Sequence, residues 1–283
     1  MPDDQRRSRT TLAHHRVSVL GSFTLSSNGN TVALSVDARR LVAYLAVHPR
    51  PQQRPTLAVG LWPGVPAGPA LRLLDDAVDA LGIPELLDGV DSDALALTSD
   101  VEVDLAEAML LVRALPDIPA DHRPDIALLS ADILPGWTAA WIVVERERFR
   151  QIRLHALEEL SLRLTAAGRN EDAVKIAFSA VHAAPSRESA RRVLIEAHLA
   201  QGDVAAAIAQ YDDYQELLRS SVGGPAPSGL EGLLPPSPAW PVLRVRRPVQ
   251  RSAVLVPGLR PARGASGSAR RLVAGGSIPD TSR

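Results

Sequence analysis

The chain has 283 residues, of which 46% are apolar, so it is long enough for two domains with buried cores. It has no cysteine, which excludes disulfides, thiolate metal sites and cysteine nucleophiles. The formal net charge is −1, but residues 1–54 hold eight arginines against three aspartates, and residues 235–283 hold nine against one. The residues between them are therefore strongly acidic, an asymmetry that bears on partners and not on fold.

Residues 1–16 form a polar basic arm that lacks the apolar stretch of a signal peptide. No run in the chain approaches the roughly 20 apolar residues that a membrane-spanning helix needs. We therefore expect a cytoplasmic protein that does not associate with a membrane.

The segment from residue 16 to residue 35 alternates apolar and polar positions on both sides of Asn28-Gly29. This dipeptide is a strong hairpin signal because both residues tolerate a positive φ. Ser35 suits the N-cap of a helix that follows, and Pro49 ends that helix. The sequence therefore predicts a β-hairpin and then a first helix.

Two more helices follow in the sequence. A short one is predicted from Pro55 to Trp62, and a third over about residues 69–82. The periodicity of the third helix predicts a buried face. That face consists of Leu71, Leu74, Val78 and Leu81.

Two extended runs, on either side of Asp91-Ser92-Asp93, predict a second hairpin after the third helix. Residues 17–112 thus have the element order of a winged helix-turn-helix flanked by hairpins. In that motif the third helix enters the DNA major groove and the last hairpin lies beside it as a wing.

Five arginines are the candidate DNA contacts. Arg72, on the third helix, could read guanine through a bidentate contact, the commonest specific contact of arginine. Phosphates could be held around the first two helices by Arg39, Arg40, Arg50 and Arg54.

The surroundings of Arg72 are acidic. It is the sole basic residue from 66 to 112, whereas residues 73–108 hold eleven carboxylates, which would repel DNA. The alternative interpretation of Arg72 is a solvated side chain that pairs with Asp75 or Asp76.

After a further helix near residues 104–115, a proline-rich break leads into a helical array over 124–234. Gly168 and Gly202 are 34 residues apart, as are Ala173 and Ala207, which is the tetratricopeptide period. Small residues at such positions let paired helices approach closely, and stacked pairs leave a surface that usually holds a protein partner. Trp137 and Trp141 are expected to anchor the first helix of the array in the core, and a ligand groove beside them is the alternative.

Residues 235–283 form an Arg/Pro-rich tail without a sustained period, and disorder is the expectation for it. Its composition suits either a nucleic-acid arm or a read-through of a shifted reading frame.

The chain offers little that would suit an enzyme. Its seven histidines have no metal-ligand spacing, and no Walker A motif occurs. The carboxylate pairs Asp75-Asp76 and Asp212-Asp213 fall on predicted helix surfaces without a nucleophile beside them. We therefore expect no catalytic residues, no cofactor and no metal.

Five stretches, in this order and spacing, resemble the bacterial transcriptional activator domain proteins, the SARP-type regulators of secondary metabolism in actinobacteria. They are LVAYLAVHPRP at 41–51, LWP at 61–63, VEVDLAEA at 101–108, LLSADILPGWTAAWIVVERERFRQIRLHALEEL at 128–160 and APSRESARRVLIEAHLAQGDVAAAIAQYDDY at 184–214. The resemblance implies a DNA-binding winged helix, an all-α repeat domain that supports dimerisation or contact with the transcription machinery, and promoter activation. The third helix departs from the arginine-rich LRxALWRLR form of the family and keeps only Arg72.

Two hypotheses follow. The first is a transcriptional activator that docks promoter DNA by its winged helix and binds RNA polymerase or another protein by its helical domain. The second is a helical-repeat adaptor that does not bind DNA and whose winged helix is a protein-interaction module. The family resemblance favours the first, and the acidic stretch 66–112 favours the second.

Overall fold

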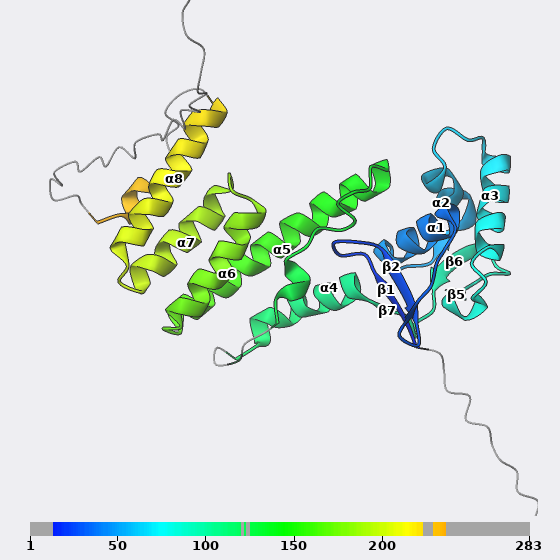
Figure 1. Cartoon of the computed structure of the whole chain (residues 1–283), viewed down its shortest axis with the longest axis horizontal. Coiled ribbons are helices and arrows are strands. Elements are labelled where there is room, and N and C mark those ends of the chain that lie inside the picture. Colours follow the sequence, from blue (N-terminus) through cyan, green and yellow to red (C-terminus); the bar gives the residue numbers. More distant parts are fainter. Residues whose placement is uncertain (1–13, 120–121, 123–124, 223–228, 236–283) are drawn as a thin grey trace, which may run out of the picture. The chain divides into compact units, whose positions relative to one another are not determined.

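A computed structural model describes residues 14–119, 122, 125–222 and 229–235 (Figure 1). Most of these residues are helical, and the named strands all lie before residue 104. The prediction of a mostly α fold with small β elements at the N-terminal side is therefore confirmed. Of the expected tail 235–283, only residue 235 is described. Residues 1–13 of the expected arm also lie outside the described residues.

The first sheet is built around β1 (His15–Ser18). Its strand order is β3-β2-β1-β7, with β2 at Thr24–Ser27, β3 at Asn30–Thr31 and β7 at Glu102–Val103. Asn28 and Gly29 have φ values of 52° and 80°, so the hairpin predicted at this dipeptide is confirmed. Strand β7 pairs with β1 in parallel.

Arg16 lies inside β1, although we expected it to be the last residue of the arm. Its guanidinium lies 2.9 Å from the carboxylates of both Glu102 and Glu107. Hydrogen bonding to Glu107 raises the pKa of Arg16. The ion pairs of Arg16 therefore join β1 to β7 and to the helix that follows β7.

The three helices of the winged helix are α1 (Val36–Val47), α2 (Arg54–Leu61) and α3 (Ala67–Asp79). The Ser35 hydroxyl accepts a hydrogen bond from the Ala38 amide at 3.2 Å, which confirms the predicted N-cap. The buried face of α3 and the turn after it consists of Ala70, Leu74, Ala77 and Leu81. The prediction is thus confirmed at Leu74 and Leu81, whereas Leu71 and Val78 are only partly buried against the core.

The wing consists of β5 (Leu87–Asp88) and β6 (Ala94–Leu97), an antiparallel pair joined on its other side by β4 (Gln52–Gln53). The second predicted hairpin is thus confirmed. Its second extended run stops at Leu97, however, because residues 102–103 leave the wing and join the first sheet.

The helical part begins at α4 (Asp104–Ala114) and contains α5 (Ala140–Ala166), α6 (Asn170–Ala183), α7 (Glu188–Ala200) and α8 (Val204–Val222). Short 3₁₀ turns occupy Leu115–Asp117, Ala127–Leu129 and Glu231–Leu233. Helices α5 to α8 lie side by side in chain order, each against the next (Figure 1). None of the described helices is long and apolar enough to cross a membrane.

The 34-residue period corresponds to two helical hairpins. Gly168 follows α5 and Gly202 follows α7, with φ values of 74° and 84° that favour glycine at a helix C-terminus. Ala173 and Ala207 are fully buried at matching positions of α6 and α8. The predicted tetratricopeptide-like pairing of helices is therefore confirmed.

The end of β1 is bonded to two distant segments. The buried Asp104 carboxylate accepts hydrogen bonds from the amides of Val19 and Leu20 at 2.9 and 3.1 Å. The Leu134 amide donates to the Val19 carbonyl at 2.9 Å, and a β-bridge joins Leu20 to Ile133. The first sheet is therefore completed by residues from beyond the proline-rich break.

Trp137 and Trp141 pack where α5 meets the winged helix. The Trp141 ring lies 4.9 Å from the Tyr44 ring of α1, and Trp137 lies 6.2 Å from Phe23. Burial raises the pKa of the Tyr44 hydroxyl, and the Glu145 carboxylate raises it further. The two tryptophans anchor the start of α5 to the core, as predicted.

Candidate nucleic-acid interface

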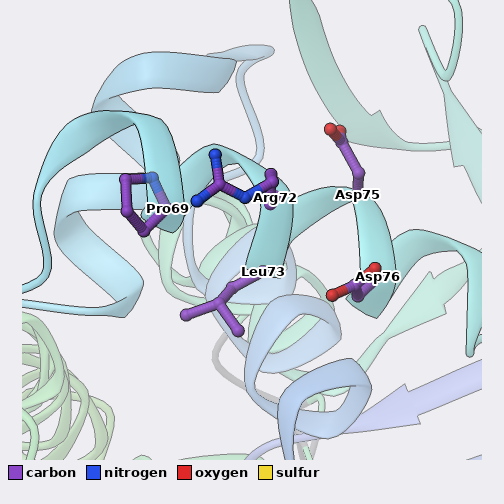
Figure 2. Close-up of a pocket in the computed structure, with 5 residues that line it drawn as sticks. All are labelled: Pro69, Arg72, Leu73, Asp75 and Asp76. Atoms are coloured by element: carbon purple, nitrogen blue, oxygen red, sulfur yellow. The ribbon is translucent and has the colours of Figure 1, made fainter.

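Helix α3 is the second helix of the helix-turn-helix and turns one face to solvent. Its buried residues pack against α1 and α2, which hold the helix in place. The outward face carries a shallow depression (Figure 2). It is lined by Pro69, Arg72, Leu73, Asp75 and Asp76.

Arg72 is exposed on this face. Its guanidinium lies beside Pro69, on the side away from the carboxylates of Asp75 and Asp76 (Figure 2). No hydrogen bond or ion pair joins Arg72 to another residue that the structure describes. The pairing with Asp75 or Asp76, which was the alternative interpretation of Arg72, is thus not formed.

The partner of Asp75 is Arg54, at the start of α2. One guanidinium nitrogen of Arg54 lies 2.5 Å from the Asp75 carboxylate, and the other donates to the Val90 carbonyl at 3.1 Å. The Arg54 amide donates to the Asp93 carbonyl at 2.9 Å. Arg54 therefore connects α2, α3 and the loop of the wing, and a phosphate would have to share its guanidinium with these groups.

The remaining three predicted contacts lie on α1 and in the loop after it. The guanidinium of Arg39 lies 5.7 Å from the centre of the Trp137 ring, and that of Arg40 lies 3.5 Å from Asp37. Arg50 is exposed in the loop after α1. The structure thus joins Arg54 to α3 through Asp75 and places Arg72 on α3 itself, whereas Arg39 and Arg40 contact Trp137 and Asp37.

The charges of α3 are divided along its length. The first half, residues 67–73, has Arg72 as its single charged side chain, while Asp75, Asp76 and Asp79 lie in the second half. The amino-terminal end of a helix also carries a partial positive charge. The half of α3 nearer its N-terminus is therefore electropositive, although the helix as a whole is acidic.

Sequence reasoning did not single out Gly68 and Pro69, which lie beside Arg72 in the first turns of α3. Gly68 is exposed, and nothing within 4 Å surrounds the position of a Cβ there. The absence of a side chain lets another molecule approach the backbone closely. A Gly-Pro pair at the start of a helix was the signal in the sequence, but it fits many helices that bind nothing.

Among the described residues, no group of three or more His, Cys, Asp or Glu side chains could hold a metal ion. The depression on α3 is open and holds no buried titratable side chain. Its geometry suits contact with a surface and not the enclosure of a substrate.

Three comparisons relate the chain to known proteins. Residues 126–233 match the family model described as "Bacterial transcriptional activator domain". The solved structure of Mycobacterium tuberculosis EmbR, in complex with a low-affinity phosphopeptide, is similar in fold with a TM-score of 0.56. The match has 18% sequence identity and covers 80% of this chain and 67% of EmbR. No curated protein matches the chain.

The family match covers α5 to α8, and the fold match extends well beyond it into the part that holds the winged helix. Residues 126–233 therefore match a bacterial transcriptional activator domain, and the fold of the chain is similar to that of EmbR.

Proposed function

We propose that this protein activates transcription by docking the N-terminal half of α3 into the major groove of promoter DNA. The observation that carries the proposal is the unpaired Arg72 guanidinium on the exposed, electropositive half of a helix-turn-helix recognition helix. In this motif the N-terminal residues of the recognition helix reach the base edges. Promoter DNA lies in the cytoplasm of a bacterium, so the proposal places the protein there.

The division of charge along α3 answers the objection raised by its carboxylates. Asp75 is already neutralised by Arg54, and Asp76 and Asp79 lie toward the end of the helix that a recognition helix keeps farther from the base edges. Arg72 would read guanine, while Arg39, Arg40, Arg50 and Arg54 would contribute phosphate contacts to differing degrees. Arg50 is the freest of these four, and Arg54 the most engaged.

The test is fluorescence-polarisation binding of the full-length protein to a randomised duplex pool across a salt series. The full chain is needed because β1 is bonded to residues 132–134. We expect affinity to fall steeply with salt, by roughly 0.9 in the logarithmic slope for each phosphate neutralised. No binding at low salt would contradict the proposal.

Sequence selection from the same pool then tests the role of Arg72. We expect Arg72→Ala to weaken binding to the selected sequence by about 1–3 kcal/mol and to relax the preference for guanine. The matched control is Arg148→Ala, which removes the same charge from an exposed position of α5. An equal effect of both variants would mean that Arg72 contributes only its charge.

We also propose that the helical domain binds RNA polymerase or another protein, and that the chain can form a homodimer. Four large apolar side chains of α5 and α6 support an interaction surface, because they are exposed without an intramolecular partner to cover them. They are Val143, Val144, Leu162 and Phe178. Light scattering after size exclusion tests the dimer, and Phe178→Asp should weaken polymerase or partner capture without changing DNA affinity.

A further inference from the structure

A second depression lies between the end of α1, helix α4 and helix α5. Its volume is about 610 Å³, which falls within the roughly 300–1,000 Å³ of small-molecule sites. Apolar side chains from all three helices form much of its lining, among them Val47, Leu105, Met109, Phe149 and Ile152. The winged helix and the transcriptional activator domain thus both contribute to one apolar surface.

The rim of this depression is cationic. Arg50, Arg113 and Arg148 line it, and Glu145 is the single carboxylate among its lining residues. Glu145 lies 3.8 Å from Arg148. Within the described part of the chain, the guanidiniums of Arg50 and Arg113 have no hydrogen-bond or ion-pair partner.

Two of the three arginines, Arg113 and Arg148, lie within residues 55–234, a stretch that is strongly acidic overall. Like charges that share one depression repel each other unless a counter-charge lies between them. Guanidinium groups bind carboxylates and related oxyanions through two parallel hydrogen bonds. A cationic rim above an apolar floor therefore complements a ligand with an anionic head group and an apolar body.

We propose that the depression between α1, α4 and α5 binds a small organic anion of this kind, a carboxylate with an apolar chain or ring. The head group contacts Arg113 and Arg50, and the apolar body lies against Met109 and Phe149. A DNA phosphate can engage Arg50 at the rim, as proposed above, but it leaves the apolar floor uncovered, so the lining of the depression favours the amphipathic ligand. The proposal does not depend on DNA binding by α3.

The experiment is isothermal titration calorimetry of the full-length protein with three probes. Octanoate carries both features of the proposed ligand, octanol carries only the apolar chain, and inorganic phosphate carries only the negative charge. We expect saturable binding of octanoate, with octanol and phosphate each at least about tenfold weaker. Equal binding of octanoate and octanol, equal binding of octanoate and phosphate, or no saturable octanoate binding would overturn the proposal.

Variants then locate the site. Arg113→Gln should weaken octanoate binding about tenfold and leave octanol unchanged, because a charge-assisted hydrogen bond is lost. Arg113 is exposed, so the fold tolerates the change. Arg72→Gln removes an equally exposed arginine from α3, outside the depression, and should leave octanoate binding as it is. If Arg113→Gln has no effect, or Arg72→Gln has the same effect, the depression is not the site.

Discussion

The arginines of α5 and those of the winged helix have the same chemistry but different uses. Arg146 donates to the carbonyls of Ile133 and Trp137 at 2.7 and 2.8 Å, and Arg163 donates to the Ile118 carbonyl at 2.9 Å. In contrast, Arg72 and Arg50 have no partner among the described residues. A count of arginines therefore says little about binding until the intramolecular partner of each guanidinium is known.

The backbone explains why arginines of α5 have intramolecular partners. The segment between α4 and α5 is irregular, so many of its carbonyls lack the partners that a helix or sheet would give them. Guanidinium groups offer five donors each and can satisfy several carbonyls at once. Helix α5 supplies these donors through Arg146, Arg153 and Arg163.

The strongest test of this comparison is Arg153→Ala. Arg153 is 2% exposed, donates to the Leu129 carbonyl at 3.0 Å and pairs with Asp132. Its removal leaves a carboxylate and a carbonyl unpaired, so we expect a loss of about 3 kcal/mol in the free energy of unfolding, measured by urea denaturation. Arg148→Ala on the same helix is the control and should cost less than about 0.5 kcal/mol. A loss at Arg153 as small as that expected for Arg148 would show that Arg153 is not structural.

The next largest expected loss of stability is that of Gly89→Ala in the wing. Gly89 has a φ of 80°, and a Cβ there would lie 2.1 Å from the Ala94 carbonyl oxygen. We expect the free energy of unfolding to fall by about 2 kcal/mol, since the left-handed backbone and the clash both oppose a side chain. Gly168→Ala has a similar φ of 74° with nothing within 4 Å, and should cost only about 1 kcal/mol. A larger loss at Gly168 would contradict this account.

Arg54→Ala tests a winged-helix arginine that has a structural use, as those of α5 have. We expect a loss of about 1 kcal/mol in the free energy of unfolding, because Asp75 is partly solvated in the pair. Faster hydrogen exchange confined to the amides of residues 88–93 would report the release of the wing loop. If exchange there is unchanged, Arg54 does not hold the wing.

The smallest expected effect on stability is that of Arg72→Gln. An exposed side chain without a partner contributes little to folding, so the free energy of unfolding should change by less than about 0.5 kcal/mol. The same variant should weaken DNA binding, which separates the two uses of arginine most clearly. A thermal melt and a polarisation titration of one preparation measure both. Marked destabilisation would place Arg72 with the structural arginines.

Local signals in the sequence were enough to predict most of the helices, caps and turns. The hairpin at Asn28-Gly29, the cap at Ser35 and the glycines at 168 and 202 depend on conformations that only a few residue types adopt. The pairing of β7 with β1 could not be predicted, because it joins residues 86 positions apart that carry no mark of their partner. Two buried residues of α3, Ala70 and Ala77, were missed because alanine is a weak marker of a buried face.

The candidate site was predictable only as a set of residue types. The sequence identified Arg72 and its acidic neighbours, but whether Asp75 would pair with Arg72 or with Arg54 depends on the tertiary packing of α2 against α3. The same holds for Arg50 and Arg113, which lie far apart in the chain and line one depression only after α1 and α4 have packed.

The bonds made by the end of β1 have a consequence for the order of folding. Strand β1 leaves the ribosome before α4 and α5, yet the Val19 amide and carbonyl are satisfied by Asp104 and Leu134. Contacts of such large sequence separation slow folding, because a long loop must close before they form. We therefore expect the helices α1 to α3 to collapse early during synthesis, and the sheet beside them to close only after α5 has begun to emerge.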